Sequence, residues 1–330
     1  LLRPLRAQLP HRRHGARRAV IRLALPRLGQ LLFVFWATGT LAFVAMHLLP
    51  GDAAYRIAAG RYGYDQVSSA AAEAVRAELG LDAPLLVQYL DWLGALLRLD
   101  LGTSLVSGLP VREEIAHLLG HTLLLAGAAT IIAAILALPA GVWAALRPGS
   151  LFDRLSLLVS VLLRAQPVFV IGLVLILLFA LYWRLFPVAG FDGPAHLVLP
   201  ATALALALAA VTARVVRASA RTALEAESFA FARSKGLPFR VAFVRHALPN
   251  FLLPVLAYLG IQLATLVEGV VMIESLFSWP GVGHGLAHAV FSRDVPMIQG
   301  AALSLGITFV LLNLAVDLVC HALDPRSRLR

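Results

Sequence analysis

Long apolar runs alternate with short polar segments along this chain, and six of the runs have the length of a membrane-spanning helix. A helix needs roughly 20 predominantly apolar residues to cross the hydrocarbon core of a bilayer. The pattern therefore predicts an all-α integral membrane protein with six transmembrane helices. The expected spans are about 31–49, 122–146, 155–182, 197–216, 251–271 and 300–320.

The composition supports a membrane protein and leaves no room for a second soluble domain. Of the 330 residues, 60% are hydrophobic and 14% are charged, and the mean hydropathy is +0.83. Such a chain has too little polar surface to cover a soluble body of this size. We expect an arginine-rich N-terminal tail, 1–27, followed by one transmembrane domain, 28–330.

The basic residues indicate how the chain is oriented. The tail 1–27 carries eight arginines and no acidic residue. Short cytoplasmic loops retain Lys and Arg, whereas translocated loops do not. The basic residues of 147–154, 213–250 and 326–330 fall on the same side, so we expect both termini in the cytoplasm. The net charge of +10 is confined to such segments. Membrane lipid is therefore the expected partner of this charge, and nucleic acid is not.

The largest polar segment, the outer loop 51–119, should lie on the opposite face. Its nine acidic residues outnumber its five arginines, which suits a translocated segment that meets a soluble partner. Apolar residues recur near helical spacing in 67–79 and again in 85–97. We expect two short amphipathic helices there, lying against the membrane domain.

The inner loop 213–250 carries the chain's most informative motif. Within it, the stretch ARSKGL at 232–237 is followed downstream by Leu248-Pro249. Lys235 is the only lysine of the chain, and Gly236 follows it. A P-loop needs Gly-x-x-x-x-Gly-Lys-Ser/Thr to cradle phosphates. An ATP-driven transporter built on this chain would therefore need separate motor subunits to bind ATP and magnesium. We expect no cofactor and no catalytic residue in this chain.

The inner loop resembles the signature loop of ABC-transporter permease subunits, with alanine at 230 where that signature has glutamate. Other stretches resemble, in the expected order, the B-type permease of dipeptide, oligopeptide and nickel importers. They include HLLPGD at 47–52, DLGTS at 100–104 and ESLFSWPGVG at 274–283. The resemblance implies the permease fold of type I ABC importers. It also implies a second homologous permease subunit, two ATPase subunits and an extracytoplasmic solute-binding protein as partners.

The same resemblance implies two sets of site residues, one at each face of the membrane. The residues expected to couple to the ATPase are Ala230, Phe231, Ala232, Arg233, Lys235, Gly236 and Leu237. The residues expected at the outer gate or in contact with the binding protein are Phe277, Trp279, Pro280, Arg293 and Asp294.

Polar groups inside the apolar runs are candidates for the translocation path, because a charge in hydrocarbon is costly and usually faces a cavity or a partner. They are Arg164, Gln166, Glu268 and Glu274, and Pro167, which directly follows Gln166, is counted with them as a candidate. We hypothesise that Arg164 and Glu268 pair across the bundle. The alternative, in which each snorkels or faces another polar neighbour, stays open.

Two histidine pairs have the i, i+4 spacing that puts both rings on one helix face. They are His117 with His121, and His284 with His288. No third ligand is evident, so we expect a structural role and no metal site, although the pairs remain weak candidates for one.

The function predicted from these features is that of a permease subunit of a bacterial ABC importer in the inner membrane. It would form half of the translocation path for di- or oligopeptides. Import of nickel or a metal chelate is the main alternative. An ion-coupled secondary transporter is a lesser alternative, since it would predict more spans and broken midplane helices.

Overall fold

The computed structural model describes residues 12–48, 51–62, 68–78, 80, 82–292 and 294–323, with the side chains of 12–25, 42, 45, 46, 53, 56, 60, 61, 268 and 269 left out. Apart from one isolated bridge between Thr103 and Pro110, the regular structure of these residues is helical. The predicted tail 1–27 lies partly outside the described residues, and the rest of it belongs to the first helix.

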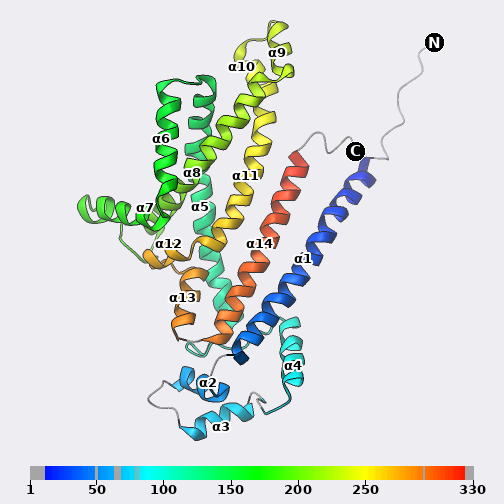
Figure 1. Cartoon of the computed structure of the whole chain (residues 1–330), viewed down its shortest axis with the longest axis vertical. Coiled ribbons are helices and arrows are strands. Elements are labelled where there is room, and N and C mark those ends of the chain that lie inside the picture. Colours follow the sequence, from blue (N-terminus) through cyan, green and yellow to red (C-terminus); the bar gives the residue numbers. More distant parts are fainter. Residues whose placement is uncertain are drawn as a thin grey trace, which may run out of the picture.

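Long helices form an elongated bundle with short helices at both ends (Figure 1). The long elements are α1 (Arg12–Leu48), α5 (Val111–Leu146), α6 (Leu151–Ala165), α8 (Pro194–Glu225), α11 (Leu248–Gly269) and α14 (Val295–Leu323). The shorter ones are α2 (Ala53–Tyr62), α3 (Ser69–Glu78), α4 (Leu85–Leu97), α7 (Val168–Leu175), the π-helix η2 (Ile176–Tyr182), α9 (Glu227–Ser234), α10 (Phe239–Ala242), the π-helix η3 (Phe243–Ala247), α12 (Val271–Leu276) and α13 (Val282–Ser292).

By length and composition, four helical segments of the described chain could cross a membrane, and a bent pair raises the number to five. The four are Val111–Leu146, Pro194–Glu225, Phe239–Val267 and Val295–Leu323, and the pair is α6 with α7 and η2. The mostly helical, multi-span architecture is confirmed, but the count of six is not. The predicted span at 31–49 lies in α1, which runs beside α14 (Figure 1).

The predicted span at 155–182 is interrupted, because the helix breaks at Gln166-Pro167. Gln166 has an extended backbone (φ −93°, ψ 139°). The ring of a proline disfavours helical geometry in the residue before it, so a helix tends to end there. The axes of Leu151–Ala165 and Val168–Tyr182 are bent by 101°. As a result α7 and η2 leave the bundle sideways (Figure 1).

Helices α5 and α8 meet along a seam of small residues. Ala133 and Ala137 of α5 pack with Ala205 and Ala209 of α8. Farther along, a Cβ placed on Gly141 would lie 2.6 Å from the backbone oxygen of Ala213. Small side chains let membrane helices approach closely enough for backbone contact. The seam therefore holds α5 and α8 in close contact within the bundle.

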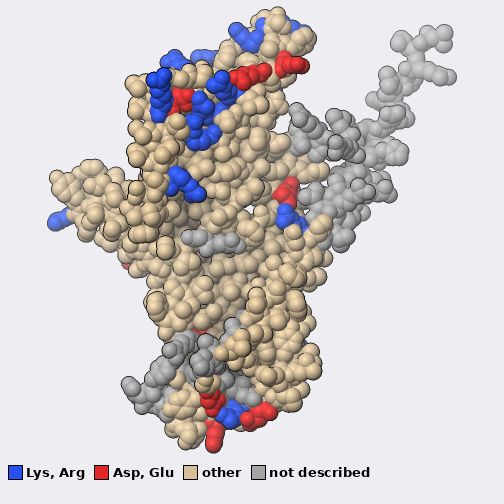
Figure 2. Space-filling view, in the orientation of Figure 1, with Lys and Arg blue, Asp and Glu red and all other residues tan. Residues whose placement is uncertain are grey.

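The two ends of the bundle differ in charge (Figure 2). Lys and Arg gather at the end formed by α6, α8 and α9, acidic side chains mark the opposite end near α2 and α3, and the surface between them carries only a few scattered charged side chains. At the acidic end the two predicted helices are confirmed as α3 and α4, the latter with the expected bounds. The sequence did not predict α2, which packs on α3 through Ile57 and Val75.

Candidate functional site

The expected coupling region forms a separate short helix, α9, at the basic end of the bundle (Figure 1). It begins at Glu227, where an acidic residue in the first turn suits the positive end of the helix dipole. It ends before Gly236, whose φ of +82° is readily adopted only by glycine. The amide of Leu237 then donates to the carbonyl of Ala232, which closes the helix end.

The two faces of α9 differ in a way that suits docking. Phe229 and Ala232 are buried against α8 and α11. Phe231 is 60% exposed, and the ammonium of Lys235 lies 4.3 Å from the centre of its ring. An exposed aromatic ring with a cation beside it is typical of an interface anchor. The remaining coupling candidates Ala230, Arg233 and Gly236 are exposed, whereas Leu237 is half-buried.

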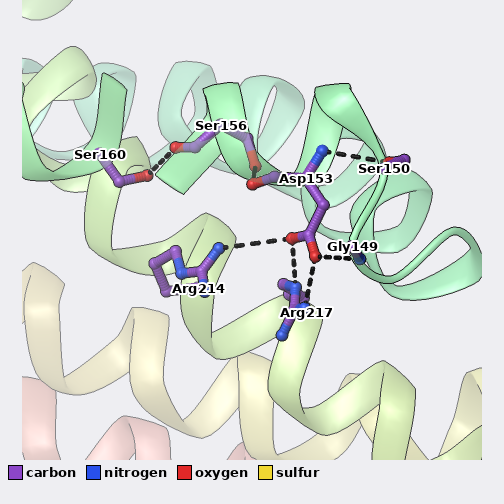
Figure 3. A network of polar contacts seen from close by, with 7 residues as sticks. All are labelled: Gly149, Ser150, Asp153, Ser156, Ser160, Arg214 and Arg217. Atoms are coloured by element: carbon purple, nitrogen blue, oxygen red, sulfur yellow. Dashed lines mark hydrogen bonds and ion pairs between the residues drawn. The ribbon is translucent and has the colours of Figure 1, made fainter. Parts of the chain in front are cut away.

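A second site at the basic end, which the sequence did not predict, joins α6 to α8 through Asp153 (Figure 3). Both carboxylate oxygens accept hydrogen bonds from Arg217, at 2.5 Å each. The amide of Gly149 donates to Oδ2 at 2.9 Å, and Arg214 lies 3.8 Å from Oδ1. The amide of Asp153 itself donates to the Ser150 hydroxyl, which caps α6. The only sequence signal was a serine three residues before an acidic residue, a common helix start.

The intramembrane candidates of the third apolar run lie at the break between α6 and α7. Arg164, Gln166 and Pro167 are all exposed there. Arg164 interacts electrostatically with Tyr258 of α11. Glu268 belongs to the same helix ten residues farther on, but its side chain lies outside the described residues. The pairing of Arg164 with Glu268 therefore stays a prediction.

Glu274 lies in a closed hydrogen-bond network at the acidic end. Its side chain is fully buried and accepts hydrogen bonds from the Thr122 hydroxyl at 2.7 Å and from the amides of Gly283 and His284 at 2.7 and 3.1 Å. Burial raises the pKa of this carboxyl, and the three donated hydrogen bonds oppose that effect. The geometry is that of a cap on the N-terminus of α13, and a role in the translocation path stays a prediction.

Three of the residues expected at the outer gate or in contact with the binding protein are buried, and their role there stays a prediction. Phe277 and Trp279 are 2% and 0% exposed, and the Trp279 indole donates to the His121 carbonyl at 3.0 Å. Asp294 is 2% exposed and accepts a hydrogen bond from Ser104 of the outer loop. Trp279 is thus joined to α5, and Asp294 to the segment that precedes α5. Pro280 is half-buried, and Arg293 lies outside the described residues.

Neither histidine pair has a third metal-binding side chain beside it among the described residues. The rings of His117 and His121 are 4.8 Å apart, and those of His284 and His288 are 4.5 Å apart. Among the residues that the structure describes, no group of three His, Cys, Asp or Glu side chains could hold a metal ion. Burial lowers the pKa of His284, and the charge of His288 adds to this effect.

Comparison with known proteins places the chain in a transport family. A family described as "Binding-protein-dependent transport system inner membrane component" matches residues 137–329. The dipeptide transport system permease protein of Escherichia coli (strain K12) is 34% identical over 340 residues, which cover 94% of this chain and 99% of the relative. The glutathione transport system permease protein of Pectobacterium atrosepticum is 37% identical over 288 residues, covering 87% and 92%.

A solved structure supports the fold. The methionine ABC transporter in an inward-facing conformation contains a chain that is similar with a TM-score of 0.53 and 19% identity, over 64% of this chain and 96% of that one. At this identity the likeness concerns the fold alone. The matched family, and the two relatives that align along almost their whole length, exclude an ion-coupled secondary transporter. The chain belongs to the family of binding-protein-dependent transport system inner membrane components.

Proposed function

We propose that this chain is the permease subunit of an ABC importer for di- or oligopeptides, and that α9 is its contact with an ATPase subunit. The observation that carries the proposal is the pairing of Phe231 with Lys235 on the exposed face of α9. An apolar ring this exposed, at a basic membrane-flanking end, is best explained by a partner that covers it. The family membership makes an ATPase the natural partner.

The peptide substrate is supported by the relatives. One bears the name of a dipeptide transport system and another that of a glutathione transport system, and glutathione is itself a tripeptide. Both align along more than nine-tenths of their own length. Peptides therefore fit as the substrate class of this chain.

Within the complex, this subunit would provide half of the path and perform no bond chemistry. A second homologous permease would provide the other half, and two ATPase subunits would bind ATP and magnesium. An extracytoplasmic binding protein would deliver the peptide at the acidic end, where the outer loop 51–119 lies. With α9 on the cytoplasmic side, both termini would be cytoplasmic, in agreement with the arginines of the tail.

Two variants test the docking of α9. Phe231→Ser removes the exposed ring of α9, and Phe291→Ser removes a ring that is 88% exposed on α13, at the opposite end. We expect Phe231→Ser to reduce co-purification of the ATPase subunits with the permease, and Phe291→Ser to leave it intact. Equal recovery of ATPase with Phe231→Ser would exclude this docking mode.

A second experiment tests the substrate. The reconstituted complex with its binding protein should raise its ATPase activity when small peptides are added. Stimulation by nickel or nickel chelates alone would reject the peptide proposal in favour of a metal importer.

A further inference from the structure

Helix α8 is held on two faces near its cytoplasmic end. On one face Val216 and Ala220 pack with Phe229 of α9 and with Phe251 of α11. On another face Arg214 and Arg217 turn toward Asp153 of α6 (Figure 3). Only Ala226 separates the end of α8 from the start of α9. The helix that carries the docking segment is thus also the helix that Asp153 contacts.

Burial and hydrogen bonds fix the position of the Asp153 side chain. The carboxylate is 7% exposed and the Arg217 side chain 20%. The planar guanidinium donates to both oxygens at once, and such bidentate pairs restrict both distance and orientation. The Gly149 amide fixes one of the oxygens further. A rotation of α8 relative to α6 would therefore break two short hydrogen bonds together.

The rest of α6 contributes little that could replace this contact. Its buried side chains are Asp153 and Ser160, and the Ser160 hydroxyl donates to the carbonyl of Ser156 within the same helix. Its large apolar side chains, such as Leu157, Val159 and Val161, are mostly exposed. Leu163 packs against the core of the bundle, but most other apolar side chains of α6 are exposed, and among the described residues the pair with Arg217 is the closest polar contact between α6 and α8.

We propose that Asp153 is a positioning residue for energy coupling: through Arg217 it makes α6 move as one body with α8 and with the docking helix α9. This inference rests on the proposed contact of α9 with an ATPase subunit. A movement of α9 can pass directly along the chain into α8 and α11, which flank the inner loop. The contact of Asp153 with Arg217 would add a second route, into α6. A movement of α9 would reach α6, and through the break at Pro167 it would reach α7.

The test compares transport with ATP hydrolysis in proteoliposomes that hold the complete complex and its peptide-loaded binding protein. Asp153→Asn keeps the shape of the side chain and removes its charge. We expect it to lower peptide uptake per ATP hydrolysed by about 2- to 30-fold, the range of coupling changes caused by mutations along such routes. Arg154→Gln, which removes an exposed charge from the same turn, should keep the wild-type ratio.

Two further variants separate positioning from general destabilisation. The exchange Asp153→Arg with Arg217→Asp should restore part of the ratio that Asp153→Asn loses. Arg217→Lys keeps the charge but loses the bidentate geometry, and it should give an intermediate ratio. An unchanged ratio in both Asp153→Asn and Arg217→Lys would overturn the proposal, as would a loss that the exchange does not restore.

A distance measurement on the full chain in nanodiscs tests the attachment without ATPase subunits. Spin labels at Leu157 of α6 and Ala218 of α8, both exposed, should give a narrow distance distribution that Asp153→Asn broadens and Arg154→Gln does not. Equal widths would overturn the inference. If instead the wild-type complex fails to hydrolyse ATP in response to peptides, the proposed substrate is wrong, and the distance data still decide the role of Asp153.

Discussion

The guanidinium of Arg27 on α1 donates two hydrogen bonds, at 3.1 and 2.5 Å, to one carboxylate oxygen of Asp317 on α14. The two side chains are 29% and 35% exposed. This pair joins α1 to α14 through Asp317. Partly exposed ion pairs contribute about 1 kcal/mol or less, and salt weakens them.

We therefore expect Asp317→Asn to lower the unfolding free energy by about 1 kcal/mol, with a smaller effect at high salt. Thermal unfolding in detergent at two salt concentrations measures this. An effect that does not depend on salt would show that packing between α1 and α14, rather than the ion pair, is what the substitution disturbs.

Gly141 should not tolerate a larger residue. Its Cβ would lie 2.6 Å from the Ala213 oxygen and 2.6 Å from the Cβ of Val216, and overpacking typically costs about 1–3 kcal/mol. Gly141→Ala should lower thermal stability accordingly. Gly127→Ala is the control on the same helix, because no heavy atom lies within 4 Å of its added Cβ. Equal stability of the two variants would contradict the close approach of α5 and α8.

The network around Glu274 predicts that Gly281 is equally constrained. A Cβ there would lie 2.0 Å from Oε1 of Glu274, whose carboxylate its hydrogen bonds hold in place. Gly281→Ala and Glu274→Ala should each destabilise the protein by about 2 kcal/mol or more, since each leaves buried polar groups unpaired. Gly120→Ala, with nothing within 4 Å, is the control. Thermal unfolding again reports the result, and a stable Gly281→Ala variant would argue against the cap.

The break in the third apolar run should depend on Pro167. In Pro167→Ala the residue before it regains access to helical geometry, so we expect the bend between α6 and α7 to decrease. Labels at Leu158 and Leu178, both exposed, would move toward the separation of about 30 Å that twenty residues span in a straight helix. Labels at Leu151 and Leu162, both within α6, provide the control. An unchanged distance would mean that the packing of Gly172 against α12 is what holds the bend.

The lowered pKa of His284 predicts a stability that depends on pH. An unfolded chain binds the proton at a higher pH than the folded one, so folding stability should fall as the pH drops below the ordinary histidine value of about 6.5. His284→Gln should flatten that part of the wild-type profile, measured as the melting temperature between about pH 7.5 and pH 5. His288→Gln removes the charge of His288, which lowers the pKa of His284 less than burial does, so this variant should flatten the profile less. Identical profiles for wild type and His284→Gln would contradict a lowered pKa of the partly buried His284 imidazole.

The sequence predicted those features that arise from local pattern. Apolar runs located the helices at Val111–Leu146, Pro194–Glu225, Phe239–Val267 and Val295–Leu323. Amphipathic spacing located α3 and α4 in the outer loop. Helix α9 ends just before Gly236, where the left-handed backbone favours glycine, and this signal is also local.

Features that depend on distant partners could not be predicted in this way. Asp153 and Arg217 are 64 residues apart. The spacing of apolar and polar residues locates helices, but it does not show which distant side chains pair with one another. The sequence placed Trp279 in a motif of the family resemblance, but it gave no sign that the indole bonds to a carbonyl 158 residues away. Pro167 was noticed beside the polar Gln166, but the apolar residues on both sides of it gave no sign of the change of direction.

The seam between α5 and α8 limits how this protein can change shape. Alanine and glycine have no side-chain rotamers to exchange, and atoms in backbone contact cannot slide past one another without separating. Helices α5 and α8 should therefore keep the same position relative to each other during the transport cycle. Conformational freedom must come from the helices around them, where exposed side chains and a proline break leave room for rotation.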